Sequence, residues 1–205
     1  MSEPELGTSC AAIVLAAGAS TRLGQPKQLL QIHGESLLHR TVRLAGETGC
    51  APIFAVLGFE ADRMVRELGG LDVKVVNNPQ WKAGMGSSLH CGMEALMQEN
   101  QLPEQVLLLL SDQPKLSGAI LLALMRKSAD MGSLIVASSY TGRLGVPAIF
   151  RKQQYSELLN VNGDKGAREV IQRHLDQTAS IDFPEGAIDI DTVQDLELLK
   201  TISPE

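Results

Sequence analysis

The chain has 205 residues, of which 44% are hydrophobic and 20% are charged, and its mean hydropathy is +0.03. This composition is typical of a globular chain with a substantial core and excludes global disorder. The formal net charge of −6 and an aromatic content of 3% argue against a nucleic-acid surface, which needs clustered cations and stacking rings. We therefore expect a small-molecule ligand and no nucleic-acid partner.

The sequence also gives no sign of membrane insertion or of a metal-binding cysteine motif. No apolar run approaches the roughly 20 residues of a membrane helix, and the start MSEPELGTSC lacks a basic segment followed by an apolar one. We expect no membrane contact and a cytoplasmic location. Cys10, Cys50 and Cys91 include no CxxC pair, and we interpret them as isolated, buried small side chains.

Short apolar runs alternate with segments of helical periodicity in the first two thirds of the chain. Continuous apolar runs predict strands buried on both faces at 11–17, 52–58, 73–77, 105–111 and 133–138. Helices are expected at 36–47, 60–68, 87–98 and 117–129; in the third, Leu89, Met93 and Leu96 share one face. This alternation predicts an α/β fold with a doubly wound, mostly parallel sheet.

The pattern changes after residue 138, where a turn leads into the strand-like segment GVPAIF, without a linker. We predict a single domain, 1–205, with a main part at about 10–138 and a small elaboration at about 139–187 that supplies a second ligand surface. In the final part, 188–202, alternation places Asp189 and Asp191 on one face of a strand. Thr192 and Asp195 then form a capping-box pattern for a last helix.

The first strand leads into the segment LAAGASTRLGQPKQLL. Gly18 and Gly24 bracket a loop at the carboxyl end of that strand, where open α/β sheets bind ligands. No Asp or Glu occurs from residue 6 to residue 34, whereas Arg22 and Lys27 are present. A local cationic pocket in an acidic chain predicts an anionic ligand.

The position of Lys27 suggests how that anion is bound. Pro26 is expected at the first position of a short helix, so Lys27 lies in the first turn, where a cation opposes the helix dipole unless an anion binds there. The alternative is a solvated polar loop. GxxxxGK[ST] is absent, as is GxGxxG after the first strand, which excludes a P-loop NTPase and a dinucleotide-binding oxidoreductase.

The segment Ser111-Asp112-Gln113-Pro114 follows the most hydrophobic strand. A carboxylate there points into the same crevice as the first loop, and magnesium is usually held by one or two carboxylates plus substrate phosphates. We assign Asp112 and Asp191 to the metal. The alternatives are an Asx-type turn at Asp112 and stabilisation of a helix start at Asp191.

Two further helix starts carry glycines. Gly84-Met85-Gly86-Ser87-Ser88 brings backbone close to a base or ribose, although Ser87 and Ser88 also suit helix N-caps. NGDKGAR, at 162–168, is either a capped, solvated helix start or a second anion site through Lys165 and Arg168. The four histidines show no metal-ligand spacing, so we assign them no chemistry. No GxSxG motif of a serine hydrolase is present either.

In order, the motifs LAAGASTRLGQPKQLL, WKAGMGSSL, SDQP, GVPAIF with NGDKGAR, and DIDTVQDLELL resemble the molybdenum cofactor cytidylyltransferase family. That family belongs to the nucleotidyltransferases with a sugar-nucleotide-synthetase, Rossmann-like fold, and the resemblance runs from about Cys10 to Leu199. It implies transfer of CMP from CTP to the phosphate of molybdopterin, with pyrophosphate released. LAAG, where guanosine-using relatives carry LAGG, favours CTP.

The resemblance also implies roles for individual residues. Lys27, Arg22 and Asp112 would be catalytic, and magnesium would be held by Asp112 and Asp191, with Asp189 left open as the second ligand. The residues implied for nucleotide binding are Leu15, Ala16, Ala17, Gly18, Ser20, Gly24, Gly86, Ser87 and Ser88. The residues implied for acceptor binding are Gln113, Gly145, Asp164, Lys165 and Arg168. A recipient molybdenum enzyme is an implied transient partner.

The chain departs from the family pattern at two places that remove no proposed functional group. Leu23 replaces a usual methionine, and Val193-Gln194 replaces a common Pro-Glu pair.

One alternative function is nucleotidyl transfer to another phosphorylated acceptor, such as a sugar phosphate. Another is a non-catalytic pterin carrier, against which the cations and carboxylates argue, because a carrier needs no metal-assisted leaving group.

Overall fold

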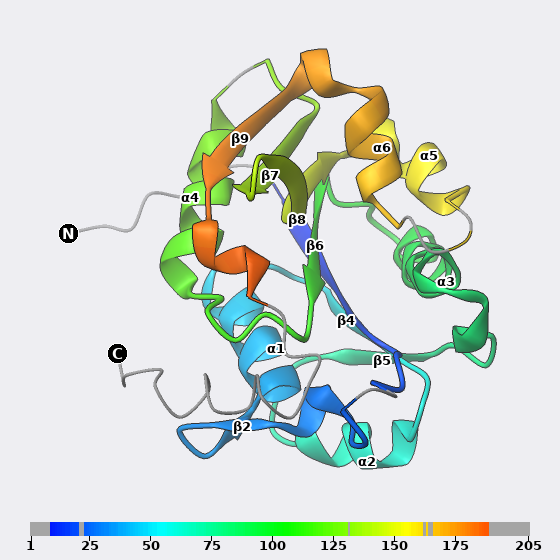
Figure 1. The fold of residues 1–205 in the computed structure, drawn as a ribbon. Helices are drawn as coiled ribbons and strands as arrows, with labels where there is room; N and C mark the ends of the chain where they lie inside the picture. The colour runs from blue at the N-terminus through cyan, green and yellow to red at the C-terminus, as the bar shows by residue number, and fades with distance from the viewer. Residues whose placement is uncertain (1–8, 21–22, 131, 162, 164–165, 189–205) are drawn as a thin grey trace.

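A computed structural model describes residues 9–20, 23–130, 132–161, 163 and 166–188. Its centre is a seven-stranded sheet in the order β5-β4-β1-β6-β8-β7-β9 (Figure 1). The strands are β1 (Cys10–Ala16), β4 (Ile53–Leu57), β5 (Lys74–Asn77), β6 (Gln105–Leu110), β7 (Ile135–Tyr140), β8 (Arg143–Arg151) and β9 (Thr178–Asp182). Only β8 runs antiparallel to its neighbours, so the predicted mostly parallel sheet is confirmed.

Helices cover both faces of this sheet (Figure 1), as in a doubly wound fold. On one face lie α1 (Leu37–Glu47), α2 (Ala61–Glu67) and α4 (Gly118–Ala129), and on the other α3 (Met85–Met97), α5 (Tyr155–Leu159) and α6 (Arg168–Arg173). A small hairpin joins β2 (Gln31–Ile32) to β3 (Glu35–Ser36). The 3-10 turns are η1 (Lys27–Leu29), η2 (Trp81–Ala83), η3 (Lys152–Gln154), η4 (Leu175–Gln177) and η5 (Pro184–Ala187).

Strand β1 divides the core into two layers because its side chains alternate between the two faces. Ala12 and Val14 pack with α1 and α4, whereas Ile13 and Leu15 pack with α3. All seven residues of β1 are buried, as its continuous apolar sequence predicts. The predicted apolar face of α3 is also confirmed, since Leu89, Met93 and Leu96 are fully buried.

Several predicted elements differ in detail from the structure. The run at 73–77 is not buried on both faces, because β5 is an edge strand that pairs only with β4 and leaves Val75 44% exposed. Helix α3 begins at Met85, two residues before the predicted start. The segment 139–187 contributes β8 and β9 to the same sheet, and the sequence did not predict β9. Among the described residues, no helix is long and apolar enough to span a membrane.

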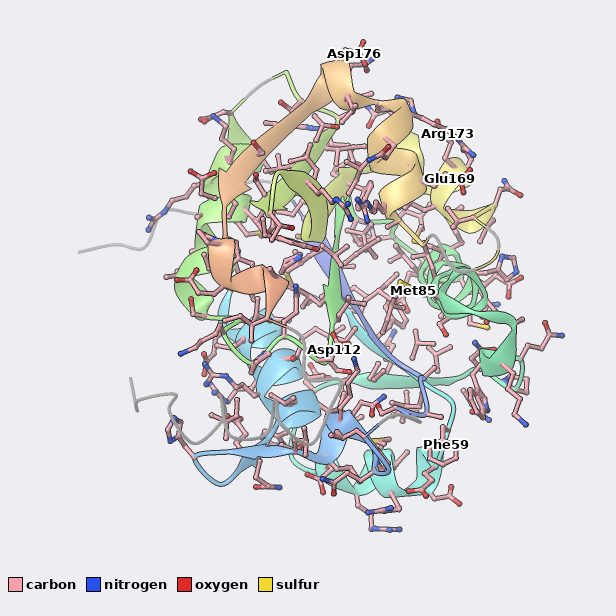
Figure 2. All side chains as sticks on the ribbon, in the orientation of Figure 1. Phe59, Met85, Asp112, Glu169, Arg173 and Asp176 are labelled. Atoms are coloured by element: carbon pink, nitrogen blue, oxygen red, sulfur yellow. The ribbon has the colours of Figure 1, made fainter. Side chains whose placement is uncertain are left out.

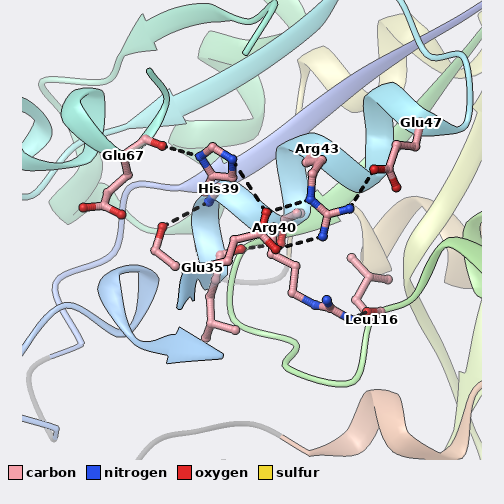
Figure 3. Close-up of polar contacts among 10 residues, drawn as sticks. Glu35, His39, Arg40, Arg43, Glu47, Glu67 and Leu116 are labelled. Carbon is pink, nitrogen blue, oxygen red and sulfur yellow. Dashed lines mark hydrogen bonds and ion pairs between the residues drawn. The ribbon is translucent and has the colours of Figure 1, made fainter. Parts of the chain in front are cut away.

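Helix α1 is tied to its neighbours by the polar contacts shown in Figure 3. The Arg43 guanidinium donates to both carboxylate oxygens of Glu35, at 2.7 and 2.8 Å, and to Glu47 at 2.7 Å. Arg40 donates to the Leu116 carbonyl oxygen at 3.1 Å, and His39 Nδ1 lies 2.7 Å from the Glu67 carbonyl oxygen. The hydrogen bonds from Arg43 lower the pKa of Glu35, and the two carboxylates raise the pKa of Arg43.

Candidate functional site

The loop that follows β1 folds back onto η1 through a buried glutamine. Gln28 is 3% exposed, and its Nε2 donates to the carbonyl oxygens of Ala16, at 3.1 Å, and Gly18, at 2.8 Å. These two bonds fix the backbone direction at the predicted ligand loop. Sequence reasoning missed Gln28, because its only signal is a polar residue between Lys27 and the apolar pair Leu29-Leu30.

Lys27 and Asp112 bring together the loops that follow β1 and β6. Lys27 Nζ lies 2.5 Å from Asp112 Oδ2, and each side chain is 18% exposed. Figure 2 shows Asp112 at the carboxyl end of β6, the edge of the sheet at which β1 also ends. The predicted juxtaposition of the two loops is therefore confirmed, and the ammonium neutralises the carboxylate.

The predicted helix N-terminus at Lys27 is wrong in its geometry. Only a single 3-10 turn of three residues forms there, and Pro26 precedes it instead of occupying its first position. The Lys27 backbone N–H donates to Ser20 Oγ at 3.1 Å, so this donor is already satisfied. In the structure, the Lys27 side chain is the group oriented toward the crevice, and Ser20, with a φ of 50°, supports the turn.

The second oxygen of Asp112 bears on metal binding. Asp112 Oδ1 is buried and finds no hydrogen-bond partner among the described residues. Buried carboxylate oxygens are normally satisfied, and a hard anionic oxygen suits a divalent cation. The described residues contain no cluster of three or more His, Cys, Asp or Glu able to hold a metal. Within the described residues, Asp112 therefore fits a divalent cation as one carboxylate ligand beside substrate phosphates.

Arg22, predicted to be catalytic, and Asp191, predicted to bind the metal, lie outside the described residues. Asp189, the alternative second metal ligand, lies outside them as well. The predicted final strand and helix, at 188–202, fall almost entirely outside as well. Their assignment stays a prediction.

A fully buried asparagine organises the start of α3. Asn78 Nδ2 donates to Ser87 Oγ at 2.9 Å and Ser88 Oγ at 3.0 Å, and its Oδ1 accepts the Gln80 N–H. Neither serine is the N-cap, because Gly84, with a φ of 102°, precedes the helix. Sequence reasoning missed the role of Asn78, although its position directly after β5 places it at the carboxyl edge of the sheet.

The two glycine-bearing segments meet in the structure. The Gly86 N–H donates to the Gly163 carbonyl oxygen at 2.8 Å, which joins the start of α3 to the predicted acceptor segment. Gly86 and Ser87 line a cavity of about 510 Å³ together with Asn78 and Gly163. Within the acceptor segment, Asp164 and Lys165 lie outside the described residues.

A second cavity, of about 550 Å³, lies on the other side of the α3 start. It is lined by the strand ends at Leu15 and Leu110, by Met85, and by the predicted acceptor residues Gly145 and Arg168. The lining is mostly apolar and includes one cation, Arg168, and one carboxylate, Glu169, so it suits a ligand with a large apolar part.

Gly145 and Gln113 occupy positions that the sequence did not anticipate. A side chain at Gly145 would collide with Tyr140 Oη, which donates to the Val146 carbonyl oxygen at 3.1 Å. Gln113 is 3% exposed, and its Nε2 donates to the carbonyl oxygens of Val146 and Gly186, both at 3.2 Å. The Gln113 side chain thus cross-links β8 to η5, and its assignment to acceptor binding stays a prediction.

The remaining predicted nucleotide-binding residues divide into exposed and buried groups. Gly18 and Gly24 are exposed and bracket the loop, as expected. Ala16, Ala17 and Ser88 are at most 5% exposed. The carbonyl oxygen of Ala17 already accepts a hydrogen bond from the Phe59 N–H, at 3.0 Å. Contacts from these buried positions to a ligand would therefore be made by backbone atoms at the loop edge.

Solved structures share this fold. The homologue of Mycobacterium tuberculosis rv0371c from Mycobacterium sp. strain JC1 is 30% identical, with a TM-score of 0.76 over 94% of this chain and 96% of that one. Rv0371c of M. tuberculosis, solved in complex with manganese, is 28% identical with a TM-score of 0.73, over 96% of this chain and all of that one. A nucleotidyl transferase from Methanothermobacter thermautotrophicus, 22% identical with a TM-score of 0.76 over 94% and 97% of the chains, supports the fold alone.

Sequence relatives differ in how much of their length they share with this chain. Nicotine blue oxidoreductase from Paenarthrobacter nicotinovorans is 29% identical over 90% of this chain and 93% of its own length. The chain spans only 20% of the bifunctional IPC transferase and DIPP synthase of Thermococcus kodakarensis, at 36% identity over 40% of this chain. The family model described as the MobA-like NTP transferase domain matches residues 12–178. The chain belongs to the MobA-like NTP transferase family and is a nucleotidyltransferase.

Proposed function

We propose that the protein transfers CMP from CTP to the phosphate of molybdopterin, with magnesium as its metal. The observation that carries the proposal is the Lys27–Asp112 pair, in which the buried Asp112 Oδ1 has no hydrogen-bond partner among the described residues. The pair lies at the sheet edge that also lines the 550 Å³ cavity. The LAAG sequence at residues 15–18 supports cytidine as the base. The family membership supports the reaction class, and the motif at 162–168 supports the pterin acceptor.

In this proposal, Lys27 exchanges partners when the nucleotide binds. The ammonium leaves the Asp112 carboxylate and pairs with triphosphate oxygens beside the loop at residues 18–24, together with Arg22. Asp112 and Asp191 are then the carboxylates that hold magnesium, which supplies positive charge for the triphosphate and the pyrophosphate leaving group. The paired state protects each charge from being left uncompensated before the ligands arrive.

The acceptor would occupy the cavity lined by Gly145 and Arg168, with its phosphate directed toward Asp112. A phosphate oxygen of the acceptor attacks the α-phosphorus of CTP, a new P–O bond forms, and the bond to pyrophosphate breaks. The acceptor supplies its own nucleophile, so positioning and charge neutralisation by the protein suffice. This division assigns the part at 10–138 to the nucleotide and the part at 139–187 to the acceptor.

The decisive experiment measures pyrophosphate release with magnesium and molybdenum-loaded molybdopterin, with CTP, GTP, ATP and UTP compared in parallel. We expect release with CTP and a product whose mass is that of the cytosine dinucleotide. Preference for another nucleotide would overturn the base assignment. Release only with sugar phosphates as acceptors would overturn the pterin assignment, and pterin binding with no release from any nucleotide would favour a carrier.

The similarity to nicotine blue oxidoreductase over nearly the whole chain favours a second candidate, a redox reaction in the same cavity. The absence of GxGxxG after β1 argues against a bound dinucleotide in this chain. Incubation of the protein with nicotine blue and NADH or NADPH, followed by absorbance, distinguishes the two. Catalytic oxidation of the nicotinamide, without pyrophosphate release from any triphosphate, would replace our proposal.

A further inference from the structure

Two cysteines distant in sequence meet at the amino-terminal edge of the sheet. Cys10 is the first residue of β1, and Cys50 lies in the loop that joins α1 to β4. Their Sγ atoms are 3.7 Å apart, and both residues are 4% exposed. The interpretation of the cysteines as isolated is therefore wrong for this pair, because β1 and the start of β4 lie side by side. Cys91, on α3, is partly exposed.

The backbone around the pair is fixed by hydrogen bonds. The Ala51 N–H donates to the Cys10 carbonyl oxygen at 2.8 Å, and the Ala12 N–H donates to the Pro52 carbonyl oxygen at 3.0 Å. These bonds extend the β1–β4 ladder to the cysteines and hold the two main chains together. A disulfide bond is about 2 Å long, so the sulfurs need to approach by less than about 2 Å, without separation of the strands.

The two thiols are chemically unequal. The hydrogen bond between the two thiols lowers the pKa of Cys50, against an opposing effect of burial. The same pairing, reinforced by burial, raises the pKa of Cys10. Because the thiolate is the nucleophile in thiol oxidation, Cys50 is the first of the two to react.

Cys50 also has a route to solvent. It lines a cavity of about 850 Å³ whose wall includes Arg43, Glu47 and Pro103. This cavity lies at the amino ends of the strands, whereas Asp112 follows the carboxyl end of β6, so a small oxidant reaches Cys50 without passing through the candidate nucleotide site. A hydroperoxide is small, uncharged and able to enter such a cavity.

We propose that Cys10 and Cys50 are a modification site at which a hydroperoxide forms a reversible intramolecular disulfide. The Cys50 thiolate attacks the peroxide oxygen, which gives a sulfenic acid and, after protonation, one molecule of water or alcohol. Cys10 then attacks the sulfenic sulfur, the S–S bond forms, and a second water leaves. Two thiols lose two hydrogens in total, and the peroxide is the oxidant that is reduced. A thiol reductant restores both thiols.

The experiment exposes the native, full-length protein to graded hydrogen peroxide, quenches it with catalase, and alkylates free thiols after unfolding. We expect the number of free thiols to fall from three to one, with a mass loss of about 2 Da and a monomeric product. Peptide mapping should find a Cys10–Cys50 cross-link that dithiothreitol removes. The same treatment of Cys91→Ala should give the same cross-link.

Matched variants separate the two sulfurs. In Cys10→Ala, the sulfenic acid at Cys50 persists and is trapped by a dione reagent, whereas Cys50→Ala gives no adduct at Cys10. Peptide mapping of the wild-type protein remains decisive if either variant folds poorly. Three outcomes would overturn the proposal: both thiols intact at doses that oxidise Cys91, over-oxidation of Cys50 without a cross-link, or only intermolecular dimers.

Discussion

At the residue scale, the contact between Lys27 and Asp112 has the largest functional consequence. Lys27→Met removes the charge and keeps much of the side-chain volume, so we expect pyrophosphate release to fall by about 10² to 10³, as for loss of one electrostatic contact to a transition state. The melting temperature should fall as well, because Asp112 is only 18% exposed and loses its partner, so turnover is measured at a temperature at which the variant is folded. Lys152→Met, which breaks only an exposed contact to Glu104, is the control. Wild-type turnover by folded Lys27→Met would remove Lys27 from the mechanism.

Gln28 is a positioning residue with a separable effect. Gln28→Glu keeps the shape but removes the donor to Ala16 and Gly18, so we expect the KM for the nucleotide to rise about tenfold or more. Loss of two buried hydrogen bonds should also lower the free energy of unfolding by about 1 to 3 kcal/mol. Steady-state kinetics and urea denaturation measure the two effects.

The control for Gln28 is a glutamine with the same burial elsewhere in the fold. Gln154 is also 3% exposed but lies in η3, away from the loop at residues 18–24. Gln154→Glu should therefore lower stability while it leaves the KM unchanged. An equal rise in KM in both variants would mean that Gln28 acts only through global stability.

The sequence predicts Lys27 and Asp112 but not Gln28 or Asn78, and the difference has a physical cause. A charge at the end of an apolar strand has its position set by that strand, so the strand pattern alone places it. A buried amide takes its role from partners distant in sequence, as Gln28 does with Ala16 and Asn78 with Ser87. Those partners become known only when the loops are folded.

At the element scale, two helical glycines predict opposite effects of the same substitution. A Cβ at Gly92 in α3 would lie 2.7 Å from Ile13 Cγ2 and 3.0 Å from Val56 Cγ2, whereas at Gly46 in α1 its nearest contact is 3.6 Å. Gly46→Ala should stabilise by about 0.5 to 1 kcal/mol through helix propensity. Gly92→Ala should destabilise by about 1 kcal/mol, because overpacking exceeds that gain. Urea denaturation of both variants measures the contrast, which equal shifts would contradict.

The elements that the sequence predicts are those with a local signal. β1, β4 and β6 are continuous apolar runs, and their burial on both faces follows from that pattern. β9 reads TASID, which carries no apolar run, and it becomes a strand because it pairs with β7. The start of α3 at Met85 depends on the backbone turn at Gly84 and the tertiary hydrogen bonds of Asn78, so the sequence pattern places this start two residues too late.

At the scale of the whole molecule, the contact between Glu35 and Arg43 makes stability depend on pH. Arg43 lowers the pKa of Glu35 in the folded protein below its usual value of 4.5, so the stabilisation from Glu35 is complete above pH 4.5 and is lost as pH falls through the lowered pKa. Glu35→Gln should cost about 0.5 to 1 kcal/mol at pH 7 and nothing once Glu35 is protonated. Glu47→Gln should cost less, since Glu47 is more exposed and makes one contact. Urea denaturation of the wild type and both variants, at pH 7 and at a pH at which Glu35 is protonated, tests this prediction. A loss of stability in Glu35→Gln that persists at the acidic pH would refute it.

Ligand binding should couple the two loops at the sheet edge into one unit. If CTP and magnesium bind together through Asp112, their joint effect on the free energy of unfolding exceeds the sum of their separate effects, because each ligand raises the affinity of the protein for the other. At about 100 times the Kd, binding adds about 2.7 kcal/mol, or roughly 5 to 10 °C in Tm for a chain of this size.

Thermal unfolding with CTP, magnesium, both, and both plus EDTA measures that coupling. Asp112→Asn should abolish the magnesium-dependent part of the shift, because the neutral amide is a poor metal ligand. Asp176→Asn is the matched control, since Asp176 is exposed on η4 at the far end of the molecule from Asp112 (Figure 2). A magnesium-dependent shift that survives in Asp112→Asn would place the metal elsewhere, whereas a full shift from CTP alone would show that nucleotide binding needs no metal.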